Sequence, residues 1–343
     1  MDGIRSQDDL YLLCLYLKLF EFCPLMDVYS LEDRTVDHII DLVDTEMSAV
    51  KQPKVLLFDI GGVCVSHWSF LHTSSGSQFL TSRQVVSPFQ AILDYELSLG
   101  IPPGWVNYSI SKTAPDGFWH KLERGFIPMD AAFFRGFNDD LHSTSRWQDF
   151  YKREQSKNPR LPEEIPPVPK VDGEWLFNQM MTVSQTPDPW MFPALKNLKA
   201  SGKYILAALS NTVIFPPGHK LHVENHTDDP VRRLFDVFVS SAHVGIRKPD
   251  PRMYQFALEQ VDKFAKDNKR PPEGVKAEDI LFLDDIGENL KQAKKQGFRT
   301  VKVHLGRAFE AVEELEAVTG LKLAGDHPKI PIKPKYPATK AKI

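Results

Sequence analysis

The chain has 343 residues, 42% of them hydrophobic and 25% charged, so it can bury the core of one large domain or of a domain that carries an insertion. Its formal net charge of −3 supplies no basic field, and we therefore expect no nucleic-acid partner. The three cysteines are odd in number and match no zinc spacing, which argues against a disulfide scaffold and favours a reducing, cytoplasmic location.

Residues 1–50 are predicted to form a helical N-terminal extension, because apolar residues recur at three- and four-residue steps in VDHIIDLV. The apolar stretch from Leu10 to Met26 is interrupted by Lys18 and Glu21. A secretory signal has a basic start and an uninterrupted apolar run, and a membrane span is longer than this stretch. We therefore expect neither a secretory leader nor a membrane partner.

Five short apolar runs predict the strands of a buried sheet. They read KVLLFD, YILAALS, FDVFVSS, DILFLDD and FRTVKVHL and begin at residues 54, 204, 235, 279 and 298. Such nearly continuous runs are typical of strands that are covered on both faces. Helical patterns such as ENLKQAKKQG lie between the later runs and complete β-α-β units. The sequence thus predicts an α/β fold whose core, residues 51–66 and 200–320, is a Rossmann-like parallel sheet.

Residues 67–199 lack this strand pattern and are rich in aromatic residues and in helix-like segments. We predict that they form an α-helical cap inserted after the first strand of the sheet. Within the cap, residues 157–170 contain five prolines, which exclude regular structure and predict a surface loop.

The tail over residues 321–343 is rich in lysine and proline and is expected to be disordered. It ends in Ala341-Lys342-Ile343, which resembles the peroxisomal Ser-Lys-Leu terminus. Peroxisomal import is therefore a second hypothesis beside the cytoplasmic location.

Candidate catalytic residues gather where the predicted strands end. Asp59 closes the first run in FDIGGV, Ser210 and Asn211 close the second in LSNT, and Asp284 and Asp285 close the fourth in FLDDIGENL. In doubly wound sheets, ligands bind at the carboxyl ends of the strands. We therefore expect these side chains to share one site.

A lysine completes this set, because GIRKPDP places Lys248 just before a predicted helix. Carboxylates and a backbone carbonyl suit Mg²⁺, which prefers oxygen ligands. A lysine and a hydroxyl can neutralise and orient a phosphoryl group, and an aspartate in line with the phosphorus can act as a nucleophile. The set predicts a magnesium-dependent site for a small phosphorylated substrate.

In order and spacing, Asp59, Ser210, Lys248 and the Asp284–Asp285 pair resemble the four motifs of the haloacid dehalogenase superfamily. The stretch FWHKLERGFIPMDAAFFRGF is similar to the W-x-x-L-E-R-G stretch of the subgroup that includes the N-terminal phosphatase domain of soluble epoxide hydrolase. The resemblance runs from about residue 54 to residue 310. In that stretch, Glu123 and Arg124 either form a salt bridge of the cap or meet the substrate.

The resemblance implies a metal site made of Asp59, Gly61, Asp284 and Asp285. Asp59 would be both the nucleophile and a ligand, and the main-chain carbonyl of Gly61 would be a second ligand. Asp285 would be the third ligand, while Asp284 would orient water or Lys248.

The resemblance also implies how the phosphoryl group is held. Ser210 and the Asn211 amide would bind its oxygens. Lys248 would offset the negative charge of both the nucleophile and the phosphoryl group.

The chain departs from the resemblance at Gly61, where the family's phosphatases usually carry a second aspartate as general acid and base. Such a group contributes about 10²–10⁴-fold to the rate. The leading hypothesis is a hydrolase, a Mg²⁺-dependent phosphatase that favours good leaving groups such as acyl or sugar-1 phosphates.

Two alternatives remain open. One is a non-catalytic or regulatory binding protein on the same fold, which Gly61 favours. The other is a metal-independent dehalogenase in which Asp59 attacks carbon. Epoxide hydrolysis is not expected, because no α/β-hydrolase domain follows residue 320 in this sequence.

Overall fold

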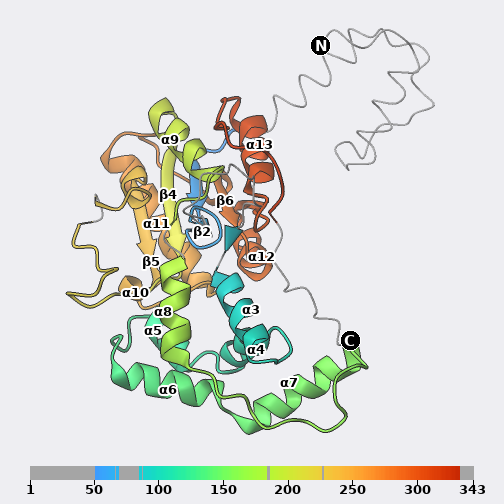
Figure 1. Cartoon of the computed structure of the whole chain (residues 1–343). Coiled ribbons are helices and arrows are strands. Elements are labelled where there is room, and N and C mark those ends of the chain that lie inside the picture. The colour runs from blue at the N-terminus through green and yellow to red at the C-terminus, as the bar shows by residue number, and fades with distance from the viewer. Residues whose placement is uncertain are drawn as a thin grey trace, which may run out of the picture. The chain divides into compact units, whose positions relative to one another are not determined.

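The structure, a computed structural model, describes residues 51–65, 67–68, 85–86, 88–183, 186–225 and 228–332 (Figure 1). The predicted extension over residues 1–50 and the C-terminal Ala341-Lys342-Ile343 lie outside these ranges. The chain divides into two compact units, Met1–Lys51 and Gln52–Ile343, and every element given below belongs to the second unit.

Five parallel strands form the main sheet, in the order β5-β4-β1-β6-β7. The central strands β1, β4 and β6 are buried along their whole length, which explains why their sequences are nearly continuous apolar runs. The predicted α/β class with a Rossmann-like parallel sheet is therefore confirmed. The strands are β1 (Val55–Phe58), β4 (Ile205–Ser210), β5 (Val237–Ser240), β6 (Ile280–Asp284) and β7 (Arg299–Lys302).

Helices cover both faces of this sheet because side chains alternate along each strand. In β1, Leu56 and Phe58 belong to one apolar cluster and Val55 and Leu57 belong to the other. The first cluster is closed by α9 (Met191–Ser201) and α13 (Ala308–Thr319), and the second by α11 (Pro251–Asp267) and α12 (Gly287–Lys295). Shorter elements of this part are η3 (Arg232–Leu234), α10 (Ser241–Val244) and η4 (Ala277–Asp279).

Most of helix α9 lies inside the range predicted for the cap, and yet the helix packs on the sheet. Its Met191, Leu195 and Leu198 are fully buried in the same cluster as Leu56. The helix starts where the carboxylate of Asp188 accepts the main-chain N–H groups of Trp190 and Met191. The sheet layer therefore starts about ten residues earlier than position 200, because a covering helix carries no strand pattern.

The helices between residues 88 and 183, called the cap below, enclose an apolar cluster of their own. Trp105, Trp147 and Phe133 are almost completely buried in it, so the cap aromatics mostly pack against each other. Residues 158–172 form neither helix nor strand. The cap helices are α3 (Pro88–Ser98), α4 (Trp105–Lys112), α5 (Phe118–Glu123), α6 (Ala131–Leu141), α7 (Thr144–Lys157) and α8 (Gly173–Val183); β2 (His67–Trp68) and β3 (Val85–Val86) precede them.

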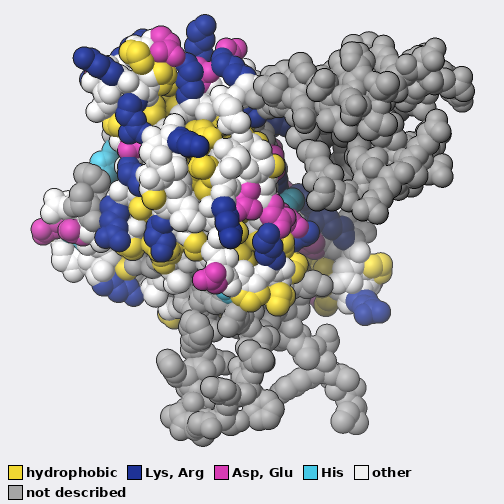
Figure 2. All heavy atoms as spheres, turned by 90° about the horizontal axis from the view of Figure 1, so that it is seen from above, with side chains coloured by type: hydrophobic (Ala, Val, Ile, Leu, Met, Phe, Trp, Pro, Cys, Tyr) yellow, Lys and Arg dark blue, Asp and Glu magenta, His cyan; other side chains and the backbone are white. Residues whose placement is uncertain are grey.

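The cap meets the sheet layer at the side where the strands end, through α5 and α10, the short helix that follows β5 (Figure 1). On the face shown in Figure 2, basic side chains are interspersed with acidic and apolar ones. Within the part of the chain that the structure describes, none of the helices combines the length and the apolar character that crossing a membrane requires.

Residues 321–332 differ from the disordered tail expected from composition. Leu323 is fully buried, and its carbonyl accepts a hydrogen bond from the Asn197 side chain at 3.0 Å. The indole N–H of Trp190 donates to the carbonyl of Pro328 at 3.0 Å. A few apolar and main-chain contacts anchor this stretch to α9, and a composition average does not reveal them.

Candidate active site

A buried lysine lies at the centre of the candidate site, at the carboxyl ends of β1 and β6. The Lys248 ammonium is 2.9 Å from Oδ1 of Asp59 and donates to Oδ2 of Asp284 at 2.7 Å. Burial alone would lower the pKa of Lys248, but the two carboxylates outweigh it and hold that pKa above its ordinary value. Lys248 is therefore a fixed positive charge between two strand ends.

Asp59, directly after β1, is also buried, with 6% of its surface exposed. Its Oδ1 accepts the main-chain N–H of Ile60 at 2.7 Å as well as the Lys248 ammonium. Burial raises the pKa of Asp59 to about 6, although the charge of Lys248 opposes this rise. The carboxylate is thus held in one orientation in a largely dry place, as an attacking nucleophile requires.

Asp284 uses both of its carboxylate oxygens inside the protein. Oδ1 accepts the main-chain N–H of Ile286 at 2.7 Å, and the Asn289 side chain donates to both oxygens at 3.1 Å. With Lys248 as a further donor, Asp284 has several partners and orients the lysine. Asn289, five residues later on α12, belongs to this network; our sequence analysis missed it, although it stands in the same FLDDIGENL stretch.

Asp285 has the opposite character. Its Oδ1 is buried and has no hydrogen-bond partner among the described residues. Burial, together with the charges of Asp59 and Asp284, raises the pKa of Asp285 to about 8. Oxygen atoms of these three carboxylates lie within 4.8 Å of one another, against one lysine. A divalent cation would supply the missing partner and neutralise the excess negative charge, so the residues fit Mg²⁺.

Two glycines follow Asp59 and differ in what they tolerate. Gly62 has a φ of 77°, and a Cβ at this position would lie 2.7 Å from Oδ2 of Asp285, so a side chain is excluded. At Gly61, no atom of the described residues lies within 4 Å of an added Cβ. The described structure therefore has room for a side chain at position 61. The family's second aspartate is missing because the sequence has glycine there, and not because packing excludes a side chain.

The Asn211 side chain is placed differently from a phosphoryl-binding amide. Its Nδ2 donates to the carbonyl of Lys248 at 3.1 Å, and its Oδ1 accepts the Lys248 main-chain N–H at 2.8 Å. Asn211 thus fastens the lysine loop to the end of β4. Ser210 ends β4 with 3% of its surface exposed, at the same edge of the sheet as Asp59.

The cap reaches this site through Glu123. Its Oε2 lies 2.7 Å from Nε of Arg247, the residue before Lys248, and its carbonyl accepts the Ser241 hydroxyl at 2.6 Å. Burial raises the pKa of Glu123, which Arg247 opposes. Glu123 was expected either to form a salt bridge of the cap or to meet the substrate. The structure shows a salt bridge, and this one joins the cap to the core. Arg247 was not singled out from the sequence, because nothing there distinguishes it from other charged residues near Lys248.

His120 lies one helical turn before Glu123 at the same junction. It is 4% exposed, and its buried Nδ1 has no hydrogen-bond partner among the described residues. Burial lowers the pKa of His120 to about 4, and the charges of Arg247 and Arg124 add to this effect. The imidazole is therefore neutral at pH 7.

Parts of the chain are similar in sequence to known proteins. No family model matches the chain. Mouse bifunctional epoxide hydrolase 2 is 37% identical over 86 residues, which are 25% of this chain and 13% of that protein. Sesquiterpene phosphatase astK of Aspergillus oryzae is 29% identical over 134 residues, or 39% of this chain and 58% of that protein. The chain thus spans only a small part of the epoxide hydrolase. These relatives confirm the resemblance to haloacid dehalogenase-like hydrolases.

Among solved structures, a HAD family enzyme from Bacteroides thetaiotaomicron, in complex with magnesium and inorganic phosphate, is 18% identical with a TM-score of 0.39. The match covers 74% of this chain and 96% of that one.

The acidic cluster predicts a thermal response to magnesium. At pH 8, adding Mg²⁺ after EDTA treatment should raise the unfolding midpoint, because a cation that binds only the folded state stabilises it. Asp285→Asn should lose most of this shift in differential scanning fluorimetry, whereas Asp267→Asn, a change of an exposed acid on α11, should keep it. An equal shift in both variants would show that the cluster is not the binding site.

His120 predicts a loss of stability in mild acid. Its pKa is about 4 in the folded protein and about 6.5 in the unfolded chain, so only the unfolded chain takes up the proton between these values. The contribution of His120 to the free energy of unfolding is therefore complete above pH 6.5, and it declines towards pH 4 by on the order of 2–3 kcal/mol. In urea unfolding, the free energy of unfolding of His120→Asn should fall less steeply between pH 7 and pH 4.5 than that of the unchanged protein. The exposed His304→Asn should follow the unchanged protein; the same slope in all three proteins would contradict this account.

Proposed function

We propose that this haloacid dehalogenase-like protein is a Mg²⁺-dependent phosphatase that hydrolyses a small phosphorylated metabolite through an aspartyl-phosphate on Asp59. The observation that carries the proposal is the buried Asp59–Lys248–Asp284 arrangement beside Asp285, whose Oδ1 has no hydrogen-bond partner among the residues that the structure describes. A fixed nucleophile, a fixed cation and a place for a metal are what phosphoryl transfer needs. A relative named as a sesquiterpene phosphatase supports the same chemistry.

In this reaction an Asp59 oxygen attacks the phosphorus, and the oxygen of the leaving group departs with the bonding electrons. Water then attacks the phosphorus of the aspartyl-phosphate, which releases inorganic phosphate and restores Asp59. Lys248 offsets the charge of the carboxylate and of the phosphoryl group throughout. The Ser210 hydroxyl and the main-chain N–H of Asn211 would hold the phosphoryl oxygens.

Asp59, Asp285 and the main-chain carbonyl of Gly61 would hold Mg²⁺, while Asp284 keeps Lys248 in place. The bound ion would neutralise the phosphoryl oxygens and so reduce their repulsion of the carboxylate nucleophile. The cap would cover the bound substrate and exclude water, with the Glu123–Arg247 pair holding it next to the lysine loop.

Gly61 limits which phosphates react readily, because no side chain at this position can protonate the leaving group. Acyl phosphates and sugar-1 phosphates leave more easily than alkyl phosphates, so they are the preferred substrates in this proposal. The same glycine favours the second candidate, a non-catalytic binding protein on this fold. A metal-independent dehalogenase has no use for the third carboxylate, Asp285.

The proposal is tested by the hydrolysis of acetyl phosphate and p-nitrophenyl phosphate with Mg²⁺ and with EDTA. We expect turnover that requires the metal and that falls by on the order of 10³-fold or more in Asp59→Asn. Asp262→Asn, a change of an acid on α11, is the matched control and should leave turnover unchanged. If a folded sample shows no metal-dependent turnover, the phosphatase proposal is wrong and the non-catalytic binding protein becomes the favoured function.

Gly61→Asp should restore the family's acid and base, because the position has room for the side chain. We expect hydrolysis of an alkyl phosphate such as β-glycerophosphate to rise about tenfold or more, within the range of general acid catalysis. Gly61→Asn has almost the same shape and transfers no proton, so it should show no gain. Equal rates in the two variants, measured as phosphate release, would contradict this role for position 61.

A further inference from the structure

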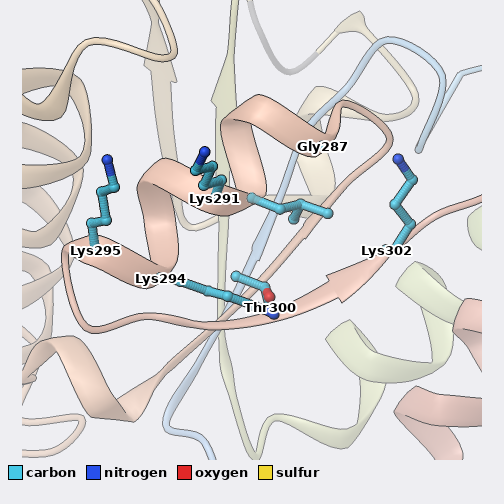
Figure 3. Close-up of a pocket in the computed structure, with 7 residues that line it drawn as sticks. Gly287, Lys291, Lys294, Lys295, Thr300 and Lys302 are labelled. Carbon is cyan, nitrogen blue, oxygen red and sulfur yellow. The ribbon is translucent and has the colours of Figure 1, made fainter.

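A second charged feature lies on the edge of the sheet, in an open hollow of about 740 Å³ between α12 and β7 (Figure 3). Lys291, Lys294 and Lys295 come from one side of α12, at spacings of three and four residues. Thr300 and Lys302 come from β7, two residues apart and therefore on one face of the strand. Its lining residues are Gly287, Leu290, Lys291, Lys294, Lys295, Thr300 and Lys302, none of them shared with the candidate active site.

The lining carries four positive charges and no acidic residue. None of the four lysines forms an ion pair with a carboxylate in the part of the chain that the structure describes. Elsewhere lysines do pair, for example Lys199 with Asp236 at 2.5 Å and Lys266 with Asp262 at 2.7 Å. The hollow thus concentrates uncompensated positive charge on a chain whose net charge is −3.

General effects account for single lysines here but not for the presence of four lysines around one hollow. A lysine on an edge strand such as β7 discourages pairing with another chain, and lysines in the last turn of α12 interact well with the helix dipole. Neither effect explains Lys291, because it lies in the middle of the helix and not on the edge strand or in the last turn. Lys302 extends to the opposite end of α12, where its Nζ would be 3.7 Å from a Cβ at Gly287. Lys291 lies one turn along from Gly287, so both lysines flank the start of the helix.

We propose that this hollow is a binding site for a small, multiply phosphorylated anion. Lysine ammonium groups are point charges that suit phosphate oxygens from several directions. The volume exceeds that of a single phosphate, and the glycine at the start of α12 lets an anion approach the free main-chain N–H groups of the first turn. Among the described residues that line the hollow none is aromatic, so recognition rests on the phosphates and not on a stacked base.

The test is isothermal titration of inorganic tripolyphosphate at constant ionic strength, with EDTA present so that no metal links the anion to Asp59 and Asp285. We expect binding that weakens at least about tenfold in Lys291→Gln/Lys302→Gln. The control, Lys152→Gln/Lys263→Gln, removes the same charge from exposed positions on α7 and α11 and should bind as the unchanged protein does. Thermal unfolding verifies that both variants fold.

Several results would overturn the proposal. Unchanged affinity in Lys291→Gln/Lys302→Gln would show that the anion binds elsewhere. An equal loss of affinity in the control would show that the anion is held only by general charge attraction. No binding at millimolar tripolyphosphate would reject the site. ATP, as a second probe, should bind about as well as tripolyphosphate, and a clear preference for it would contradict phosphate-only recognition. Tighter binding of a hexa-aspartate peptide would identify an acidic protein segment as the occupant.

Discussion

The contact on which the site depends is the Lys248 ammonium held between Asp59 and Asp284. A lysine with 1% of its surface exposed is costly to bury unless it is paired, and here it has two carboxylate partners from neighbouring strands. The same contact fixes the direction of the Asp59 carboxylate. Removing Lys248 would leave two buried carboxylates without their shared cation, so the packing of the strand ends depends on the same three side chains as the site.

The surroundings of Lys248 extend this constraint in two directions. On the core side, Asn211 binds both main-chain polar groups of the lysine, which ties its loop to β4. On the cap side, Arg247 meets Glu123, so the residue beside the lysine also holds the cap. One short loop thereby joins the strand ends, Asp59 and the cap. Asp285 lies outside this network, and a cation fits there because its Oδ1 has no partner in the described part of the chain.

The two charged features of the molecule are electrostatically opposite. The candidate active site gathers three carboxylates around one lysine and favours a cation, whereas the hollow on β7 gathers four lysines without an acid among the described lining residues and favours an anion. They lie on neighbouring strands of the sheet, since Lys302 of β7 is paired in register with Asp284 of β6. Such separation of charge in a chain of small net charge indicates that partners are selected locally and not by the overall field.

The sequence alone determined the parallel sheet and the order of the motif residues, because buried strands show as apolar runs and the motif residues stand at or beside their ends. These signals are local. It did not determine that α9 belongs to the sheet layer, that Leu323 anchors the tail, or that Asn211 turns to Lys248. Nor did it reveal Arg247 as the partner of Glu123, or the lysine hollow. Each of these depends on which residues meet across many positions in the chain, and only the packed tertiary structure decides which charges and polar groups become neighbours.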